Sequence, residues 1–115
     1  MHLIQEVTDG VTVVEPYGRI DSTNAAQFSE RLMALLEAGR TAIVVNLQNV
    51  RYLTSAGFHA VLLANRAAVE RQGKIVLCGL LGEVKRLFEV GGFVQEFLIC
   101  QTRGEGIENL KQLTR

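Results

Sequence analysis

Strand-like and helix-like segments alternate along most of this chain, and this alternation constrains its fold more than any other feature. The apolar, β-branched runs at residues 41–46 and 74–78 have the length and composition of buried strands. Between them lies a segment whose apolar residues recur at helical spacing. Strand–helix–strand units with short connections favour right-handed crossovers and a sheet covered by helices. We therefore expect an α/β fold.

The chain opens with a predicted hairpin. Residues 3–8 and 11–17 alternate in the manner of strands and flank Asp9-Gly10, a dipeptide suited to the positive φ angles of a tight turn. Pro16 has no N–H group to donate, so the second strand should end there or lie against an open edge. The predicted sheet is therefore mixed, with an antiparallel pair at its start.

Two longer helices are predicted. The first follows Gly18-Arg19-Ile20-Asp21, can be capped by Ser22 or Thr23 and stops at Gly39. Its apolar positions are Phe28, Leu32, Leu35 and Leu36. The second begins at Thr54 and ends at Gly73. Its predicted buried side holds Phe58, Val61, Leu62, Ala68 and Val69, and its outer side Asn65, Arg66, Glu70 and Arg71.

The remaining segments complete one domain, expected to span residues 1–115. Residues 47–53 are interpreted as a connection, 84–90 as a short helix, 97–100 as a strand and 106–113 as a last helix. The expected architecture is a sheet of about five strands covered by about four helices.

Composition narrows the possible functions. The 12 basic residues balance 12 acidic ones without a basic stripe, which argues against nucleic-acid binding. We expect no signal peptide and no membrane segment, hence a cytoplasmic protein, because no apolar stretch approaches the roughly 18 residues that span a bilayer. Cys78 and Cys100 lack a CxxC motif or a nearby His, so we interpret both as small buried hydrophobic residues and expect no metal and no cofactor.

The functional interpretation depends on residues 45–58. Thr54 is suited to be a helix N-cap and Ser55 to lie in the first turn. The first N–H groups of a helix lack intrahelical acceptors and its dipole is positive there, so the fold should tolerate a phosphate on Ser55. Gly57 is expected to keep the approach to this helix end free of a side chain. On spacing alone, a helix cap without a further task is the simpler interpretation of the hydroxyl pair.

The same segment resembles the signature of the anti-sigma factor antagonists of the STAS domain family. That signature is a strand ending in aliphatic–Asp/Asn–Leu, followed by Asp-Ser-Ser/Thr-Gly-Leu at the start of a helix. The corresponding residues are Val45-Asn46-Leu47 and Thr54-Ser55-Ala56-Gly57-Phe58. Further resemblances are Gly18-Arg19-Ile20-Asp21, Lys85-Arg86-Leu87-Phe88 and Gly92-Phe93. Two residues depart from the signature: Thr54 stands where the family usually has Asp, and Ala56 stands where a second hydroxyl residue is common. The missing carboxylate could alter recognition by the kinase, and it also removes a like charge beside the phosphate.

The resemblance implies a phosphorylation-controlled switch in protein binding, and no enzyme activity. Ser55 corresponds to the serine that is phosphorylated in the family. The unphosphorylated protein, expected to be a monomer, would bind an anti-sigma factor that is also a serine kinase. Phosphorylation would release it, and a PP2C-type phosphatase would restore binding. The predicted partner-binding residues are Asp21, Thr54, Ser55, Ala56, Gly57, Phe58 and His59.

Several of these residues have a plainer interpretation. Asp21 is either a partner contact or part of the helix entry. Asn46 more simply ties down the loop after its strand by hydrogen bonds. His59 shares a helix face with Ser55 and is either beside the phosphate or a solvated surface residue. Arg51 and Tyr52 receive no role.

Two other functions are considered. A hydrolase using Ser55 and His59 would need an orienting third group and an oxyanion site, and nothing nearby in the sequence supplies the orienting carboxylate. The stronger alternative is a non-switching STAS scaffold subunit of a signalling assembly or of a lipid-transport ATPase. In that case Ser55 stays unmodified, and an Asp at this position should hardly matter.

Overall fold

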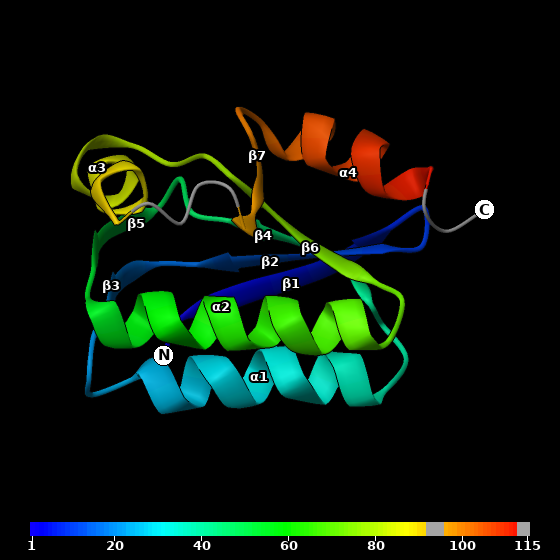
Figure 1. Cartoon of the computed structure of the whole chain (residues 1–115), viewed down its shortest axis with the longest axis horizontal. Coiled ribbons are helices and arrows are strands. Elements are labelled where there is room, and N and C mark those ends of the chain that lie inside the picture. The colour runs from blue at the N-terminus through cyan, green and yellow to red at the C-terminus, as the bar shows by residue number, and fades with distance from the viewer. Residues whose placement is uncertain (92–95, 113–115) are drawn as a thin grey trace.

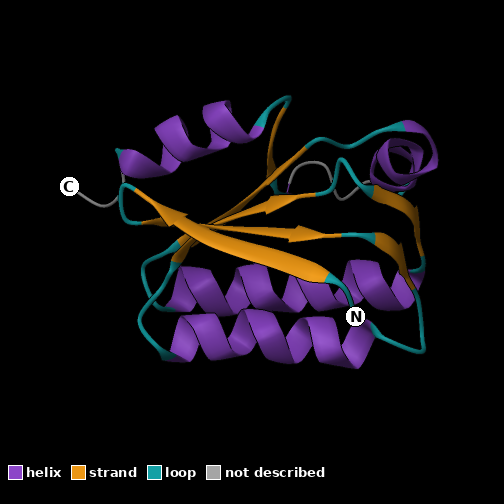
Figure 2. Cartoon of the chain, turned by 180° about the vertical axis from the view of Figure 1, so that it is seen from behind, coloured by secondary structure: helices purple, strands orange, loops and turns teal. Residues whose placement is uncertain are grey.

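A computed structural model describes residues 1–91 and 96–112. Its main sheet contains β1 (Leu3–Thr8), β2 (Val11–Pro16), β4 (Ala42–Asn46), β6 (Lys74–Cys78) and β7 (Leu98–Cys100), in that spatial order. The β1–β2 pair is antiparallel, and every later pair is parallel. The strands form one twisted layer between two layers of helices (Figures 1 and 2). The predicted mixed sheet with an opening hairpin is confirmed.

The hairpin turn follows from its two central residues. Asp9 and Gly10 have φ angles of 53° and 80°, the left-handed pair that a two-residue hairpin needs. The last pair of β1 and β2 joins Leu3 to Pro16, so the strand ends at the proline, where the missing N–H group costs no ladder hydrogen bond.

Helices cover both faces of the sheet. On one face α1 (Ala25–Glu37) and α2 (Ser55–Glu70) lie side by side, with both N-terminal ends at the same end of the molecule (Figure 1). On the other face α4 (Arg103–Lys111) packs over the sheet, and the short α3 (Gly82–Val90) lies beside the strand that precedes α2. No helix of the described residues is long and apolar enough to span a bilayer.

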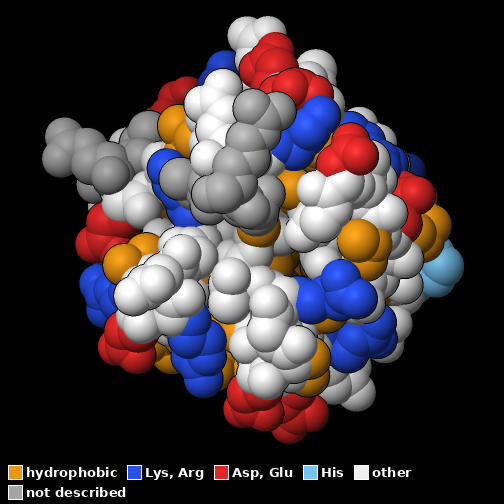
Figure 3. Space-filling view, turned by 90° about the vertical axis from the view of Figure 1, so that its right-hand side faces the viewer, with side chains coloured by type: hydrophobic (Ala, Val, Ile, Leu, Met, Phe, Trp, Pro, Cys, Tyr) orange, Lys and Arg blue, Asp and Glu red, His pale blue; other side chains and the backbone are white. Residues whose placement is uncertain are grey.

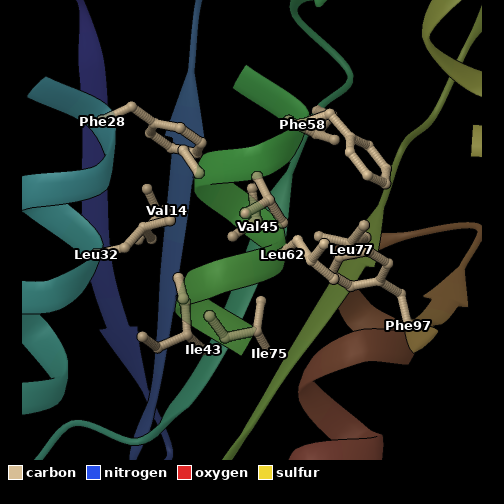
Figure 4. Packing of buried hydrophobic residues seen from close by; sticks show 14 of the residues in the cluster. Val14, Phe28, Leu32, Ile43, Val45, Phe58, Leu62, Ile75, Leu77 and Phe97 are labelled. Carbon is tan, nitrogen blue, oxygen red and sulfur yellow. The ribbon is translucent and has the colours of Figure 1, made fainter. Parts of the chain in front are cut away.

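The main core lies between the sheet and the α1–α2 pair. The inward side chains of β2, β4 and β6 meet the apolar stripes of both helices, as the spacing of those stripes predicts. Figure 4 shows Val14, Ile43, Val45, Ile75 and Leu77 packed against Phe28, Leu32, Phe58 and Leu62. A second apolar cluster under α4 contains Val11, Val13, Val44, Val76, Ile107 and Leu110.

A second, two-stranded sheet was not predicted. β3 (Gly18–Ile20) pairs in parallel with β5 (Val50–Leu53), a segment interpreted from the sequence as part of a connection. The pairing joins residues about thirty positions apart in the chain, which short-range patterns do not reveal. It places the segment before α1 beside the segment before α2 (Figure 1).

The helix ends differ from several predictions. Neither Ser22 nor Thr23 caps α1, because the N-cap position falls on Asn24 without a side-chain capping bond. At the end of α2, the left-handed residue is Gln72, with φ of 62°, rather than Gly73. The last helix begins at Arg103, three residues before the predicted start, because the Thr102 hydroxyl accepts a hydrogen bond from the backbone N–H of Glu105. Its predicted end, Leu113, lies outside the described residues, as does Gly92-Phe93.

Two residues of α2 and one cysteine lie differently from prediction. Asn65, predicted to face outward, is buried. Its polar side chain is accommodated there because its N–H donates to the Glu96 carbonyl and its oxygen accepts from the backbone N–H of Ile75. Val69, predicted to be buried, is 59% exposed. Cys78 is fully buried, whereas Cys100 is only half-buried, and both thiols are free.

Candidate functional site

Ser55 is the first residue of α2 and its side chain is exposed. The chain reaches it through β5 and Thr54, whose extended backbone, with ψ of 171°, turns the strand into the helix. The 16-residue helix directs its positive end at this point. The Ser55 side chain is therefore open to solvent at the start of the helix.

Thr54 occupies the N-cap position of α2 but its side chain does not cap the helix. Its hydroxyl lies 3.4 Å from the carbonyl oxygen of Ile20 and donates to it, while its backbone N–H donates to the same oxygen at 3.0 Å. The Thr54 side chain thus provides no acceptor for the first N–H groups of α2, and the first turn contains no acidic residue. An oxygen-rich anion at Ser55 would supply one.

Gly57 and Phe58 support the site from beneath and are not part of its accessible surface. Gly57 is buried, and a Cβ atom placed there would lie 2.6 Å from Leu53 Cδ1 and 2.7 Å from Ile20 Cγ2. The glycine therefore lets α2 pack closely on the β3–β5 sheet, whereas the sequence suggested that it keeps the outer approach open. The ring of Phe58 packs against Phe88 of α3, with the ring centroids 4.9 Å apart.

Asp21 lies in the loop between β3 and α1, beside the start of α2. Its carboxylate accepts hydrogen bonds from the backbone N–H and the hydroxyl of Thr23 and lies 3.6 Å from Arg19 Nε. The bonds from Thr23, with a smaller contribution from Arg19, lower the pKa of Asp21. The Asp21 backbone N–H donates to Asn24, so the loop is held by local hydrogen bonds as well as carrying a partly exposed charge.

The remaining predicted residues divide between surface and interior. His59 is exposed one turn beyond Ser55, and Ala56 is half-buried between them. Asn46 is 1% exposed, and its side-chain oxygen accepts from the backbone N–H of Gln48, so it holds the loop after β4 as expected. Within the described residues, no group of three or more His, Cys, Asp or Glu side chains is placed to hold a metal ion.

The structure adds one pair to which the sequence assigned no role. The guanidinium of Arg19 lies over the ring of Tyr52, 4.5 Å from its centroid. The two residues face each other across the β3–β5 ladder, 33 positions apart in sequence. In the sequence, Arg19 stands in a family-like motif and Tyr52 stands close to Ser55, which could have drawn attention to each residue. That the two residues contact each other follows only from the pairing of β3 with β5.

Comparisons with known proteins agree with this fold. The sequence profile of the STAS domain matches residues 2–106. BtrV of Bordetella bronchiseptica, predicted to be an anti-sigma factor antagonist, is 33% identical over 103 residues, covering 90% of this chain and 89% of BtrV.

Two solved structures share the whole architecture. A predicted anti-sigma factor antagonist from Thermotoga maritima superposes with a TM-score of 0.90 at 18% identity, covering 95% of this chain and 94% of that one. The Bacillus cell fate determinant SpoIIAA, in its phosphorylated form, superposes with a TM-score of 0.73 at 21% identity, covering 94% and 98% of the two chains.

Proposed function

Because this chain belongs to the STAS domain family, we propose that it is an anti-sigma factor antagonist whose binding to a serine kinase is controlled by phosphorylation of Ser55. The observation that carries the proposal is an exposed serine at the uncapped N-terminus of α2. BtrV, the relative described above, is predicted to be an anti-sigma factor antagonist, and SpoIIAA shows that a protein of this fold exists in a phosphorylated form.

The proposed cycle needs no chemistry from this chain beyond one hydroxyl. The anti-sigma factor kinase transfers the γ-phosphoryl group of ATP to Ser55 Oγ, which loses its proton, and ADP leaves. A PP2C-type phosphatase then hydrolyses the ester with water and releases inorganic phosphate. The unphosphorylated form binds the kinase and so frees the sigma factor that the kinase would otherwise hold.

Local electrostatics explain why the modification breaks the complex and spares the fold. A phosphate adds nearly two negative charges. At the N-terminal end of α2 the helix dipole stabilises that negative charge by about 0.3–1 kcal/mol. In a closed interface, an unpaired charge costs about 3–5 kcal/mol. At 1.4 kcal/mol per tenfold change, the affinity should fall about a hundred- to a few-thousand-fold.

The experiment combines mapping with binding. The protein is incubated with an anti-sigma factor kinase of its own organism and with ATP, and the phosphate, which we expect on Ser55, is located by mass spectrometry. Kinase affinity is then measured for Ser55→Ala and Ser55→Asp. The Ala variant should bind like the parent, whereas the Asp variant should bind far more weakly.

A matched control carries the same extra charge elsewhere. Gln5 lies on the exposed edge strand β1, where it accepts a hydrogen bond from Arg31. Gln5→Glu should leave the affinity unchanged. If Ser55→Ala and Ser55→Asp bind equally well, the switch is wrong, and the non-switching scaffold interpretation gains support.

A further inference from the structure

Beside the candidate site is a recess of about 790 Å³ that neither the mechanism nor the sequence interpretation uses. It lies along the β3–β5 sheet and the loop after β4. We name it the arginine recess, and the residues that matter for its chemistry are Tyr17, Arg19, Gln48, Asn49, Arg51 and Tyr52. Arg51 and Tyr52 lie on β5, the strand that leads through Leu53 and Thr54 to Ser55 at the start of α2, so the recess lies near Ser55 along the chain.

The charged side chains that line the arginine recess are both cationic. Arg19 is already oriented, because its guanidinium stacks on Tyr52 and lies 3.6 Å from the Asp21 carboxylate. Arg51 is exposed and has neither an ion pair nor a side-chain hydrogen bond within residues 1–91 and 96–112. A stacked, oriented arginine loses little further side-chain entropy on binding, which is one reason why Arg and Tyr predominate in binding hot spots.

A buried carboxylate that does not itself line the recess holds two of its lining residues. Glu15, at the end of β2, is 8% exposed and accepts hydrogen bonds from Asn49 Nδ2 at 3.0 Å and Gln48 Nε2 at 3.4 Å. These bonds fix both amide groups and turn an N–H donor of each toward Glu15. Their carbonyl oxygens are left to accept hydrogen bonds from other donors.

The chemistry of the arginine recess matches an acidic polypeptide segment. Carboxylate side chains suit the two guanidinium groups, and backbone N–H groups of a peptide suit the amide oxygens of Gln48 and Asn49. A fully deprotonated inorganic anion such as sulfate offers no donor for those oxygens. We propose that the arginine recess docks an acidic segment of the kinase partner, next to Ser55 but independent of its modification. This inference rests on the proposed function for the identity of the partner.

Charge reversal at Arg51 tests the docking. Association of the anti-sigma factor kinase is measured at ~50 mM and ~500 mM salt, because attraction between exposed charges is screened at high salt. Arg51→Glu should slow association about three- to tenfold at low salt and little at high salt. Arg40→Glu is the matched control, since Arg40 is exposed beyond the C-terminal end of α1, at the opposite end of the molecule.

Figure 3 shows the end of the molecule where α1 and α2 finish, with acidic and basic side chains intermixed and hydrophobic ones in small separate spots. Arg40→Glu should therefore leave the association rate unchanged. Ser55 should still be phosphorylated in Arg51→Glu at saturating protein concentration. If wild type binds and is phosphorylated at Ser55, yet the two Arg variants associate alike, the docking inference is wrong while the proposed function stands.

A second measurement does not depend on the kinase. Isotope-labelled protein is titrated with a short glutamate-rich peptide and followed by NMR. The amide signals of Gln48, Asn49, Arg51 and Tyr52 should shift, and Arg51→Glu should abolish the shifts. Absence of shifts at these residues, or shifts spread evenly over all exposed arginines, would overturn the inference even if no kinase binds.

Discussion

Replacing Gly57 by Ala should destabilise the domain, although alanine is the better helix residue. The new methyl group would lie 2.6 Å from Leu53 Cδ1 and 2.7 Å from Ile20 Cγ2, well inside van der Waals contact. Leu53 can move the end of its side chain, but Ile20 is fully buried, and its branched Cβ lies only 3.2 Å away. The strain therefore falls mainly on Ile20 and on the β3 strand that carries it.

The size of the effect follows from two opposing contributions. Overpacking of a closed core costs about 1–3 kcal/mol. Alanine recovers up to about 1 kcal/mol of helix propensity. We expect a net loss of about 1–2 kcal/mol in the free energy of unfolding. With a urea dependence of about 1–3 kcal/mol per molar, the unfolding midpoint should fall by roughly 0.3–2 M.

The control is the same substitution at Gly104 in α4. There a Cβ atom would meet only Thr102 Oγ1, at an ordinary distance of 3.8 Å. Gly104→Ala should therefore raise the free energy of unfolding by about 0.4–1 kcal/mol. Urea unfolding of both variants, followed by circular dichroism, compares them directly. A Gly57→Ala variant as stable as the parent would show that α2 does not need its close approach to β3 and β5.

Three further outcomes are expected. Asn65→Ala should lower the free energy of unfolding by about 1–3 kcal/mol, because it leaves the buried backbone N–H of Ile75 and the part-buried carbonyl of Glu96 without their side-chain partner, and urea unfolding measures this. Burial raises the pKa of Cys78 to about 12 and also raises the pKa of Cys100. In the native protein at pH 8, Cys78 should therefore resist a thiol reagent and Cys100 should react slowly. Rapid labelling of Cys78 would contradict this. Hydrogen bonds from Thr23 lower the pKa of Asp21, so this carboxylate stabilises the fold above its ordinary unfolded pKa and loses that effect as pH falls through its folded pKa. Thr23→Ala should raise the pKa of Asp21 in an NMR titration, and an unchanged titration would refute the assigned cause.

The elements that were predicted correctly are those that depend only on residues close together in the sequence. The Asp9-Gly10 turn requires only the φ angles of two adjacent residues. The apolar stripe of α1 from Phe28 to Leu36 is read from helical spacing alone. The position of Ser55 at a helix start was predicted in the same way, because it requires only that a strand be recognised before this residue and a helix after it.

The features that were not predicted all depend on contacts between residues far apart in the sequence. Asn65 appeared polar and outward, but its hydrogen-bond partners come from Ile75 and Glu96, which only the fold brings near. β3 and β5 are too short to be recognised by periodicity, and they exist because each pairs with the other. The inward orientation of Gly57 and the arginine recess both depend on that pairing, so neither could be predicted before the second sheet was known.

The small β3–β5 sheet has a mechanical consequence for the surface that carries Asp21 and Ser55. The Thr54 backbone N–H donates to the Ile20 carbonyl, so the last bond of this ladder fastens the two loops at the point where each leaves its strand. A docked protein that displaces one loop should therefore displace the other with it. We expect the two loops to respond to a partner as one unit.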